Sequence, residues 1–209
     1  INMNKTILLT GATDGIGLET AKMLLAQGHT VLLHGRSQAK LNALQVALTE
    51  QYPNASTHTY IADLSDMSQV QTLAKNVLAD MAENNNQLDV LINNAGVYQL
   101  VDATTIDGLD ARFVVNTIAP YLLTKLLLPV LGHDSRVVNV SSAEQSSVNL
   151  NALIGNTELS DSAAYAQSKL AITMWSRHLG LELKDTGPLV VSVNPKSLLG
   201  SKMVKDAYG

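Results

Sequence analysis

The sequence predicts an α/β fold in which a doubly wound parallel sheet carries helices on both faces. Short runs rich in Ile, Leu and Val alternate with longer segments whose apolar residues recur at i, i+3, i+4 and i+7. The short runs show almost no polar alternation, which is typical of strands buried on both faces and therefore of a parallel sheet. Right-handed crossovers then predict a Rossmann-like sheet with strand order 3-2-1-4-5-6.

The elements follow one another in a regular order along the chain. The predicted strands are 6–10, 30–34, 57–61, 88–93, 136–141 and 189–194. The predicted helices are 17–27, 38–51, 67–83, 109–131 and 163–184. A segment rich in Ser and Asn, 143–161, is expected to be a loop at the carboxyl edge of the sheet. We expect residues 1–209 to form one domain.

Composition excludes several classes of partner. The net charge of −4 and the lack of any Lys/Arg run argue against nucleic acid and against an anionic membrane. The chain has no Cys, and no two of its five His are three or four residues apart, so no metal site is expected. We find no apolar run of about 18 residues and no export leader, and we expect a cytoplasmic protein.

The first chemical motif is the turn after the first strand. Gly11, Gly15 and Gly17 follow a strand and open a helix, with the spacing G-x-x-x-G-x-G. Such a turn lets the backbone approach a pyrophosphate that rests on the amide groups at the start of the helix. The alternative is a tight connection that needs glycine for packing alone.

The end of the second strand indicates which nucleotide is preferred. An acid there would accept a ribose 2′-hydroxyl, but no Asp or Glu occurs between Glu19 and Glu50. Arg36 and Ser37 instead offer a guanidinium fork and a hydroxyl that suit a 2′-phosphate. The sequence therefore favours NADP over NAD, unless Arg36 is an ordinary solvated loop cation.

Tyr165 and Lys169 are the candidate acid/base pair. Residues four apart share one helix face, so the ammonium can lie near the phenol and lower its pKa, which is about 10 in water. The pair Tyr121 and Lys125 has the same spacing. It lies inside an apolar helical segment, whereas Tyr165 follows a strand that ends in serines, so we interpret Tyr121 and Lys125 as structural.

Together these motifs resemble the short-chain dehydrogenase/reductase family over nearly the whole chain, with some likeness to its retinol-dehydrogenase-like branch. The matching segments are TGATDGIG at 10–17, Asp63-Leu64, NNAG at 93–96, Asn116, VVNVSS at 137–142, YAQSK at 165–169 and Asn194-Pro195.

The resemblance implies a set of catalytic roles. Tyr165 would donate a proton to a carbonyl, and Ser142 would hydrogen-bond and orient the carbonyl oxygen. Lys169 would bind the nicotinamide ribose and lower the Tyr165 pKa, while Asn116 would hold a water in the proton relay. Donors placed where an alkoxide develops stabilise the transition state.

The resemblance also implies contacts with the cofactor. The implied residues are Gly11, Thr13, Asp14, Gly15, Ile16, Gly17, Arg36, Ser37, Asp63, Leu64, Asn93, Ala95, Gly96, Tyr165, Lys169 and Pro195. Simpler interpretations remain open for some of them. Asn93 and Asn94 would then only cap a strand end, and Asp63 would be the N-cap of a helix from Ser65 onwards.

The chain departs from the family pattern in three places. Lys196 follows Pro195 where the family usually has Pro-Gly. Between Ser142 and Tyr165 lie 22 residues, more than in many members. The family usually continues to a further helix and a seventh strand, and we expect this chain, which ends at Gly209, to lack them.

The function that the sequence predicts is an NADP(H)-dependent oxidoreductase that interconverts a carbonyl and an alcohol on a small-molecule substrate. By resemblance we expect a homodimer or a homotetramer. The alternative is a non-catalytic dinucleotide-binding module with a regulatory or interaction role.

Overall fold

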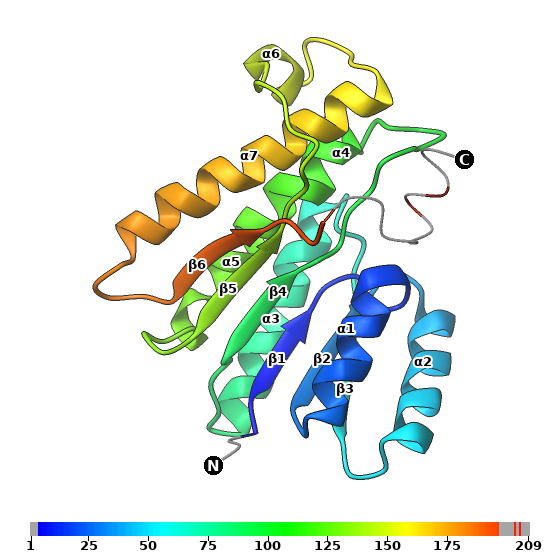
Figure 1. Ribbon diagram of the computed structural model, residues 1–209, viewed down its shortest axis with the longest axis vertical. Helices are drawn as coiled ribbons and strands as arrows, with labels where there is room; N and C mark the ends of the chain where they lie inside the picture. Colours follow the sequence, from blue (N-terminus) through cyan, green and yellow to red (C-terminus); the bar gives the residue numbers. More distant parts are fainter. Residues whose placement is uncertain (1–3, 197–202, 204, 206–209) are drawn as a thin grey trace.

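Six parallel strands form the sheet in a computed structural model that describes residues 4–196, 203 and 205 (Figure 1). Their spatial order is β3-β2-β1-β4-β5-β6, which confirms the predicted order. The strands are β1 (Thr6–Leu9), β2 (Thr30–Gly35), β3 (Ser56–Ile61), β4 (Val90–Asn93), β5 (Arg136–Val140) and β6 (Leu189–Val193). Each lies within two residues of its predicted bounds.

Helices cover both faces of the sheet. They are α1 (Gly15–Ala26), α2 (Gln38–Gln51), α3 (Met67–Glu83), α4 (Ala111–Phe113), the π-helical turn η1 (Val114–Ile118), α5 (Ala119–Leu127), the 3-10 turn η2 (Leu128–Val130), α6 (Leu150–Leu153) and α7 (Asp161–Glu182). Leu9 of β1 packs with the core under α1 and α2, whereas Leu8 packs with the core under α3, α5 and α7. Successive side chains of a strand thus point into two cores, one on each face of the sheet, as a doubly wound sheet requires.

Two predicted elements need correction. The predicted helix 109–131 begins at Ala111, passes through the π-turn η1 and ends in η2. The predicted loop 143–161 contains the short helix α6, and its last residue already belongs to α7. The expected lack of a further helix and a seventh strand concerns the chain beyond Lys196, which lies outside the described residues except at 203 and 205.

The stretch Ala111–Val130 also corrects the statement that no apolar run is long enough to span a bilayer. Its 20 residues contain a window of 18 with a mean hydropathy of 1.5, and in the described part of the chain it alone meets that length and composition. Its most apolar window is 56% buried, and Leu123 and Leu127 belong to the core that also contains α3 residues. A core helix satisfies the same test, so the stretch is weak evidence for a membrane span.

The amino ends of α1, α2 and α3 all face the carboxyl edge of the sheet. Each begins at a capping side chain, Asp14, Ser37 and Asp66 respectively, that accepts a hydrogen bond from a backbone N–H in the first turn. The turns after β1, β2 and β3 therefore meet at one edge, where the candidate site lies.

Candidate functional site

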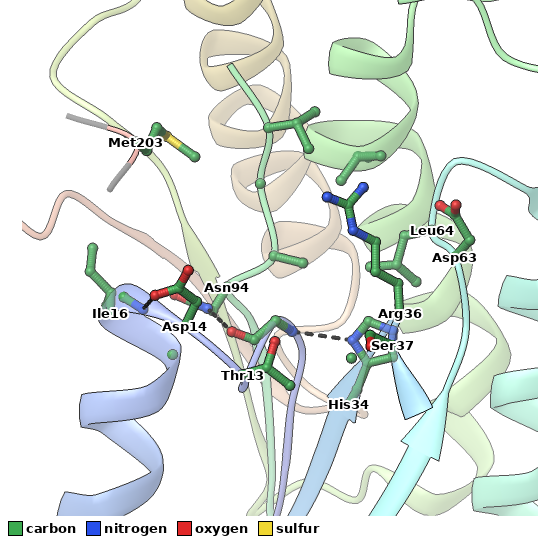
Figure 2. A pocket seen from close by; sticks show the side chains of 18 of the residues that line it. Thr13, Asp14, Ile16, His34, Arg36, Ser37, Asp63, Leu64, Asn94 and Met203 are labelled. Atoms are coloured by element: carbon green, nitrogen blue, oxygen red, sulfur yellow. Dashed lines mark hydrogen bonds between the residues drawn. The ribbon is translucent and has the colours of Figure 1, made fainter. Parts of the chain in front are cut away.

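A cleft of about 470 Å³ lies at the carboxyl edge of the sheet (Figure 2). It is bounded by the turn after β1, the ends of β2 and β3, and the segment after β4. Twelve of the predicted cofactor residues line it: Gly11, Thr13, Asp14, Gly15, Ile16, Gly17, Arg36, Ser37, Asp63, Leu64, Ala95 and Gly96. The cleft thus brings together motifs from four separate parts of the sequence.

The glycine turn after β1 is closely packed. Gly11 has a φ of 65°, in the left-handed region that favours glycine. A Cβ added at Gly17 would lie 2.0 Å from the Gly11 oxygen and 2.6 Å from Asn94 Nδ2. Packing therefore demands glycine at 17, and the same absence of side chains leaves the turn open towards the cleft.

Asn94 ties the segment after β4 to this turn. Its Nδ2 donates to the carbonyl oxygens of Thr10 and Gly11, at 3.0 and 3.2 Å. Thr10 Oγ1 accepts from the backbone N–H groups of Asn94 and Ala95. The alternative in which Asn94 only caps a strand end does not account for these contacts, because its side chain holds the glycine turn in place.

Cationic side chains gather at one end of the cleft. Arg36 and Lys40 are both exposed and both line it. Ser37 caps α2 by accepting a hydrogen bond from the Lys40 N–H, which leaves its own hydroxyl hydrogen available. Sequence reasoning missed Lys40, which lies in the first turn of α2 and has no motif of its own.

Asp63 lies at the end of β3 and lines the cleft. Its carboxylate accepts hydrogen bonds from the backbone N–H and the hydroxyl of Ser65, at 2.9 and 2.7 Å. The α3 helix begins at Met67 with Asp66 as its N-cap. The alternative that made Asp63 the N-cap of a helix from Ser65 is therefore wrong.

Tyr165 and Lys169 are buried on α7, 8% and 4% exposed respectively. Lys169 Nζ donates to the Val140 carbonyl oxygen at 2.9 Å and lies 5.6 Å from the centre of the Tyr165 ring. Ser142 follows β5, and its hydroxyl accepts from the Glu144 N–H at 3.1 Å. The fold thus brings together the strand end and the helix face that the motifs predict.

The pKa values in this group differ from expectation. Burial raises the pKa of the Tyr165 phenol, while its hydrogen bond with Ser142 lowers it and nearby Glu144 and Tyr98 raise it further. Burial also lowers the pKa of Lys169 to about 8. The Tyr165 pKa is therefore raised, and not lowered as expected from Lys169, because loss of solvent is the largest influence on it.

Gly96 joins the cleft to the catalytic candidates. A Cβ built on it would lie 3.4 Å from Asn116 Oδ1, 3.6 Å from Lys169 Nζ and 3.8 Å from the terminal methyl of Met203. The next residues continue the link, because Tyr98 lines the cleft and packs its ring against Tyr165. The cleft wall at 96–98 therefore borders the predicted chemical centre.

Asn116 lies in the π-turn η1 and is fully buried. Its Nδ2 donates to the Val97 oxygen at 2.9 Å and to Ser168 Oγ at 3.0 Å, and its Oδ1 accepts from the Val97 N–H at 2.8 Å. π-Turns are often found at functional sites. Both N–H groups and the oxygen of the side chain are thus used within the protein, so the predicted role of Asn116 in holding a water stays a prediction.

Four predicted cofactor residues lie outside the cleft lining. Asn93 is buried, and its Nδ2 donates to Thr124 and Asn139 in a polar network between β4, β5 and α5. Pro195 follows β6 and does not line the cleft. Tyr165 and Lys169 also lie beyond the lining residues, on the far side of Gly96 and Tyr98.

The pair Tyr121 and Lys125 lies elsewhere, as predicted. Tyr121 on α5 is 41% exposed and packs edge-on against Trp175 of α7, with ring centres 5.4 Å apart. Within the described residues, no group of three or more His, Cys, Asp or Glu side chains is placed to hold a metal ion.

An ion cluster around the buried Arg112 links the starts of α4 and α7. Arg112, 3% exposed, donates through Nε and Nη2 to the two carboxylate oxygens of Asp110, at 2.9 and 2.7 Å, and through Nη1 to Asp161. Arg112 precedes Asn116 by four residues, and Asp161 precedes Tyr165 by four. The cluster therefore lies one helical turn from two predicted catalytic residues.

Comparisons with known proteins agree with this geometry. A family model described as short chain dehydrogenase matches residues 5–208. Human polyprenol dehydrogenase is 35% identical over 197 residues, 90% of this chain and 58% of that protein. Bovine retinol dehydrogenase 12 is 33% identical over 208 residues, 98% of this chain and 64% of that protein.

Solved structures share the fold. A short chain dehydrogenase from Shigella flexneri, complexed with NADP, superposes with a TM-score of 0.77 and 27% identity, over 99% of this chain and 82% of that one. The chain spans about three fifths of the length of the curated relatives it matches.

Proposed function

The chain belongs to the short-chain dehydrogenase family, and on this basis we propose that it interconverts a carbonyl and an alcohol on a small molecule with NADP(H). One observation carries the proposal. A cleft with cations at one end borders, through Gly96 and Tyr98, the group formed by Ser142, Tyr165 and Lys169.

The cleft residues fit a phosphorylated dinucleotide. Arg36 and Lys40 supply positive charge, and Ser37 supplies a hydroxyl, beside the end of β2 where a 2′-phosphate would be recognised. The amino end of α1 and the open turn at Gly15 suit a pyrophosphate. The Shigella relative's complex with NADP supports the same choice of cofactor.

The residues near the chemical centre have separate roles. NADP(H), when bound, supplies or accepts the hydride. Tyr165 exchanges the proton of the alcohol oxygen, Ser142 donates a hydrogen bond to that oxygen, and Lys169 supplies positive charge close to the phenol. Asn116 holds the segment at Val97 against α7 and so fixes the distance between cleft and phenol.

The proposal is tested by titrating the protein with NADPH and NADH while following nicotinamide fluorescence. Arg36→Ala is the test variant, and Arg136→Ala, an exposed arginine on β5, is its control. We expect preferential NADPH binding that is lost in Arg36→Ala and kept in Arg136→Ala. Failure to bind either nucleotide contradicts the proposal, and binding without turnover of any carbonyl in a broad panel favours the non-catalytic module.

We also propose that the protein is cytoplasmic and forms a homodimer or a homotetramer. Apolar side chains on the outer faces of α5 and α7 are exposed, among them Tyr121, Met174 and Leu181. Light scattering after size-exclusion chromatography tests the assembly, and a monomer contradicts it. Fractionation of cells tests the location, and recovery with membranes contradicts it.

A further inference from the structure

His34, in β2, links two of the segments that form the cleft (Figure 2). Its imidazole is 3% exposed. Nδ1 accepts a hydrogen bond from the Gly11 N–H at 3.1 Å, and Nε2 lies 3.0 Å from the Ala62 carbonyl oxygen. One side chain therefore joins the glycine turn after β1 to the residue that follows β3.

These partners determine where the proton lies. Because the Gly11 N–H donates, Nδ1 must carry a lone pair, and the ring proton is on Nε2, which donates it to Ala62. Burial lowers the pKa of His34 below its ordinary 6.5, although the Ala62 carbonyl and the Asp63 carboxylate act in the opposite direction. The neutral ring is thus the form that the folded protein favours.

Charged groups from the neighbouring elements line the same cleft as His34. Asp14 after β1, Arg36 after β2, Lys40 on α2 and Asp63 after β3 line the same cleft. Of these, the Asp63 carboxylate favours the protonated ring. These charges are of both signs. A second ring proton would abolish the hydrogen bond to Gly11, because a protonated Nδ1 can no longer accept it.

The turn at Gly11 is held from two sides. Its N–H donates to His34 of β2, and its carbonyl accepts from Asn94 after β4. A proton on Nδ1 would set two donors against each other and force the turn to move. When a binding-competent conformation is only partly populated, the apparent affinity falls by that fraction.

We propose that His34 is a positioning residue for the dinucleotide site: its neutral imidazole holds the glycine turn in the shape that receives the pyrophosphate, and a second ring proton releases that turn. The inference rests on the proposed function and extends it to a residue that no motif identifies. If this is so, the affinity for the cofactor falls at low pH because of a residue that does not contact the reacting atoms.

Three variants separate the two hydrogen bonds of the ring. His34→Asn places an oxygen at the δ position, so it keeps an acceptor for Gly11 and cannot titrate. His34→Gln places an N–H donor at the ε position for Ala62 and gives up the δ acceptor. His29→Asn is the matched control, because His29 Nδ1 accepts from the Lys5 N–H at 3.3 Å just before β2, at the other edge of the sheet.

The first measurement is calorimetric titration with NADP⁺ at about pH 7.5 and about pH 5. The 2′-phosphate itself gains a proton near pH 6, so the Kd of each variant is compared with that of the wild type at the same pH. We expect His34→Asn to bind like the wild type at the higher pH and more tightly than the wild type at the lower pH. We expect His34→Gln to bind about tenfold more weakly at the higher pH, with kcat at saturating NADP⁺ unchanged.

An equal loss of NADP⁺ affinity at the lower pH in the wild type and in His34→Asn would overturn the inference. Wild-type affinity in His34→Gln at the higher pH would overturn it too. His29→Asn should follow the wild type at both pH values. A second measurement, hydrogen exchange of the peptide spanning the glycine turn in the free protein, needs no cofactor. Faster exchange in His34→Gln than in His29→Asn supports the inference, and equal exchange overturns it, whereas absence of NADP⁺ binding in the wild type contradicts the proposed function.

Discussion

The rings of Tyr98 and Tyr165 lie with their centres 4.7 Å apart and their planes inclined at 52°. Tyr98 lines the nucleotide cleft, and Tyr165 is the predicted proton donor on α7. The Tyr98 side chain also raises the pKa of the Tyr165 phenol, since two negative charges at this distance disfavour each other. One aromatic pair therefore connects the cleft wall to the chemistry both by packing and by charge.

Replacing Tyr98 separates those two effects. Tyr98→Phe keeps the ring and removes the second ionisable phenol, so the Tyr165 pKa should fall and the limb of the kcat profile that reports it should move to lower pH. Tyr98→Ala also removes the packing, which is worth about 0.5–1.5 kcal/mol beyond its area, and should lower kcat/KM about tenfold. An unchanged pH profile in Tyr98→Phe would contradict the coupling.

Tyr165→Phe should abolish turnover and leave the cofactor site intact. Loss of a positioned acid/base costs about 10²–10⁴ in rate, whereas the cleft is lined by other residues. Steady-state rates and the Kd for NADPH are measured on the same preparation. Tyr121→Phe, which changes the tyrosine of the matching Tyr121–Lys125 pair, is the control and should keep full activity, and full activity in Tyr165→Phe would refute the proposed role.

Lys169 should make the protein more stable in mild alkali. Its pKa is about 8 in the fold against 10.5 ordinarily, so between these values the unfolded chain binds a proton that the folded chain does not. Stability then rises with pH across that window. Urea unfolding of the wild type and of Lys169→Met at about pH 8 and about pH 9.5 measures this, and the wild type should gain relative to the variant. If the variant instead gained stability relative to the wild type at the higher pH, the folded protein would favour the charged form of Lys169.

Arg112→Met should destabilise the fold. It leaves the Asp110 and Asp161 carboxylates unpaired at the starts of α4 and α7, and because Asp161 is half exposed we expect a loss of about 2–4 kcal/mol in the free energy of unfolding. Arg177→Met, on an exposed site of α7, is the control and should change stability by less than about 0.5 kcal/mol. Equal losses in the two variants would mean that the ion cluster around Arg112 contributes nothing specific.

Lys196→Gly should stabilise the chain after β6. Lys196 has a φ of 80°, a left-handed conformation that costs a residue with a Cβ about 1–2 kcal/mol. Glycine removes that cost but adds entropy to the unfolded chain, which leaves a net gain of up to about 1 kcal/mol. Lys196→Val should lose stability at the same site. Thermal unfolding ranks the three proteins, and any order other than Gly, Lys, Val contradicts the argument.

The sheet could be predicted because most of its strands are recognisable from their apolar composition alone. Runs such as Thr30–Gly35 are apolar throughout, and a strand buried on both faces needs that composition. β3 alternates exposed and half-buried residues because it is an edge strand, yet its place between two predicted helices still identified it. Helix starts were less certain, since Asp63 and Asp66 are both good caps and only the backbone selects Asp66.

Short motifs identify candidate site residues, but no motif marks single side chains whose contacts run across the fold. The motifs located Arg36 and Tyr165. No periodicity announces that His34 will accept from Gly11, or that Lys40 will turn towards the cleft, because those contacts depend on how separate elements pack. Burial is equally hidden in a sequence, and it reverses the expected direction of the Tyr165 pKa.

The π-turn η1 carries one residue more than a regular helix would need between α4 and α5. Deleting that residue would restore regular winding, and every later residue of the helix would rotate by about 100°. Leu123 and Leu127 would then leave the core, and Arg112 would lose its fixed relation to the residues that follow. Insertions and deletions between Ala111 and Leu127 should therefore destabilise the fold, because each would shift these side chains away from their partners.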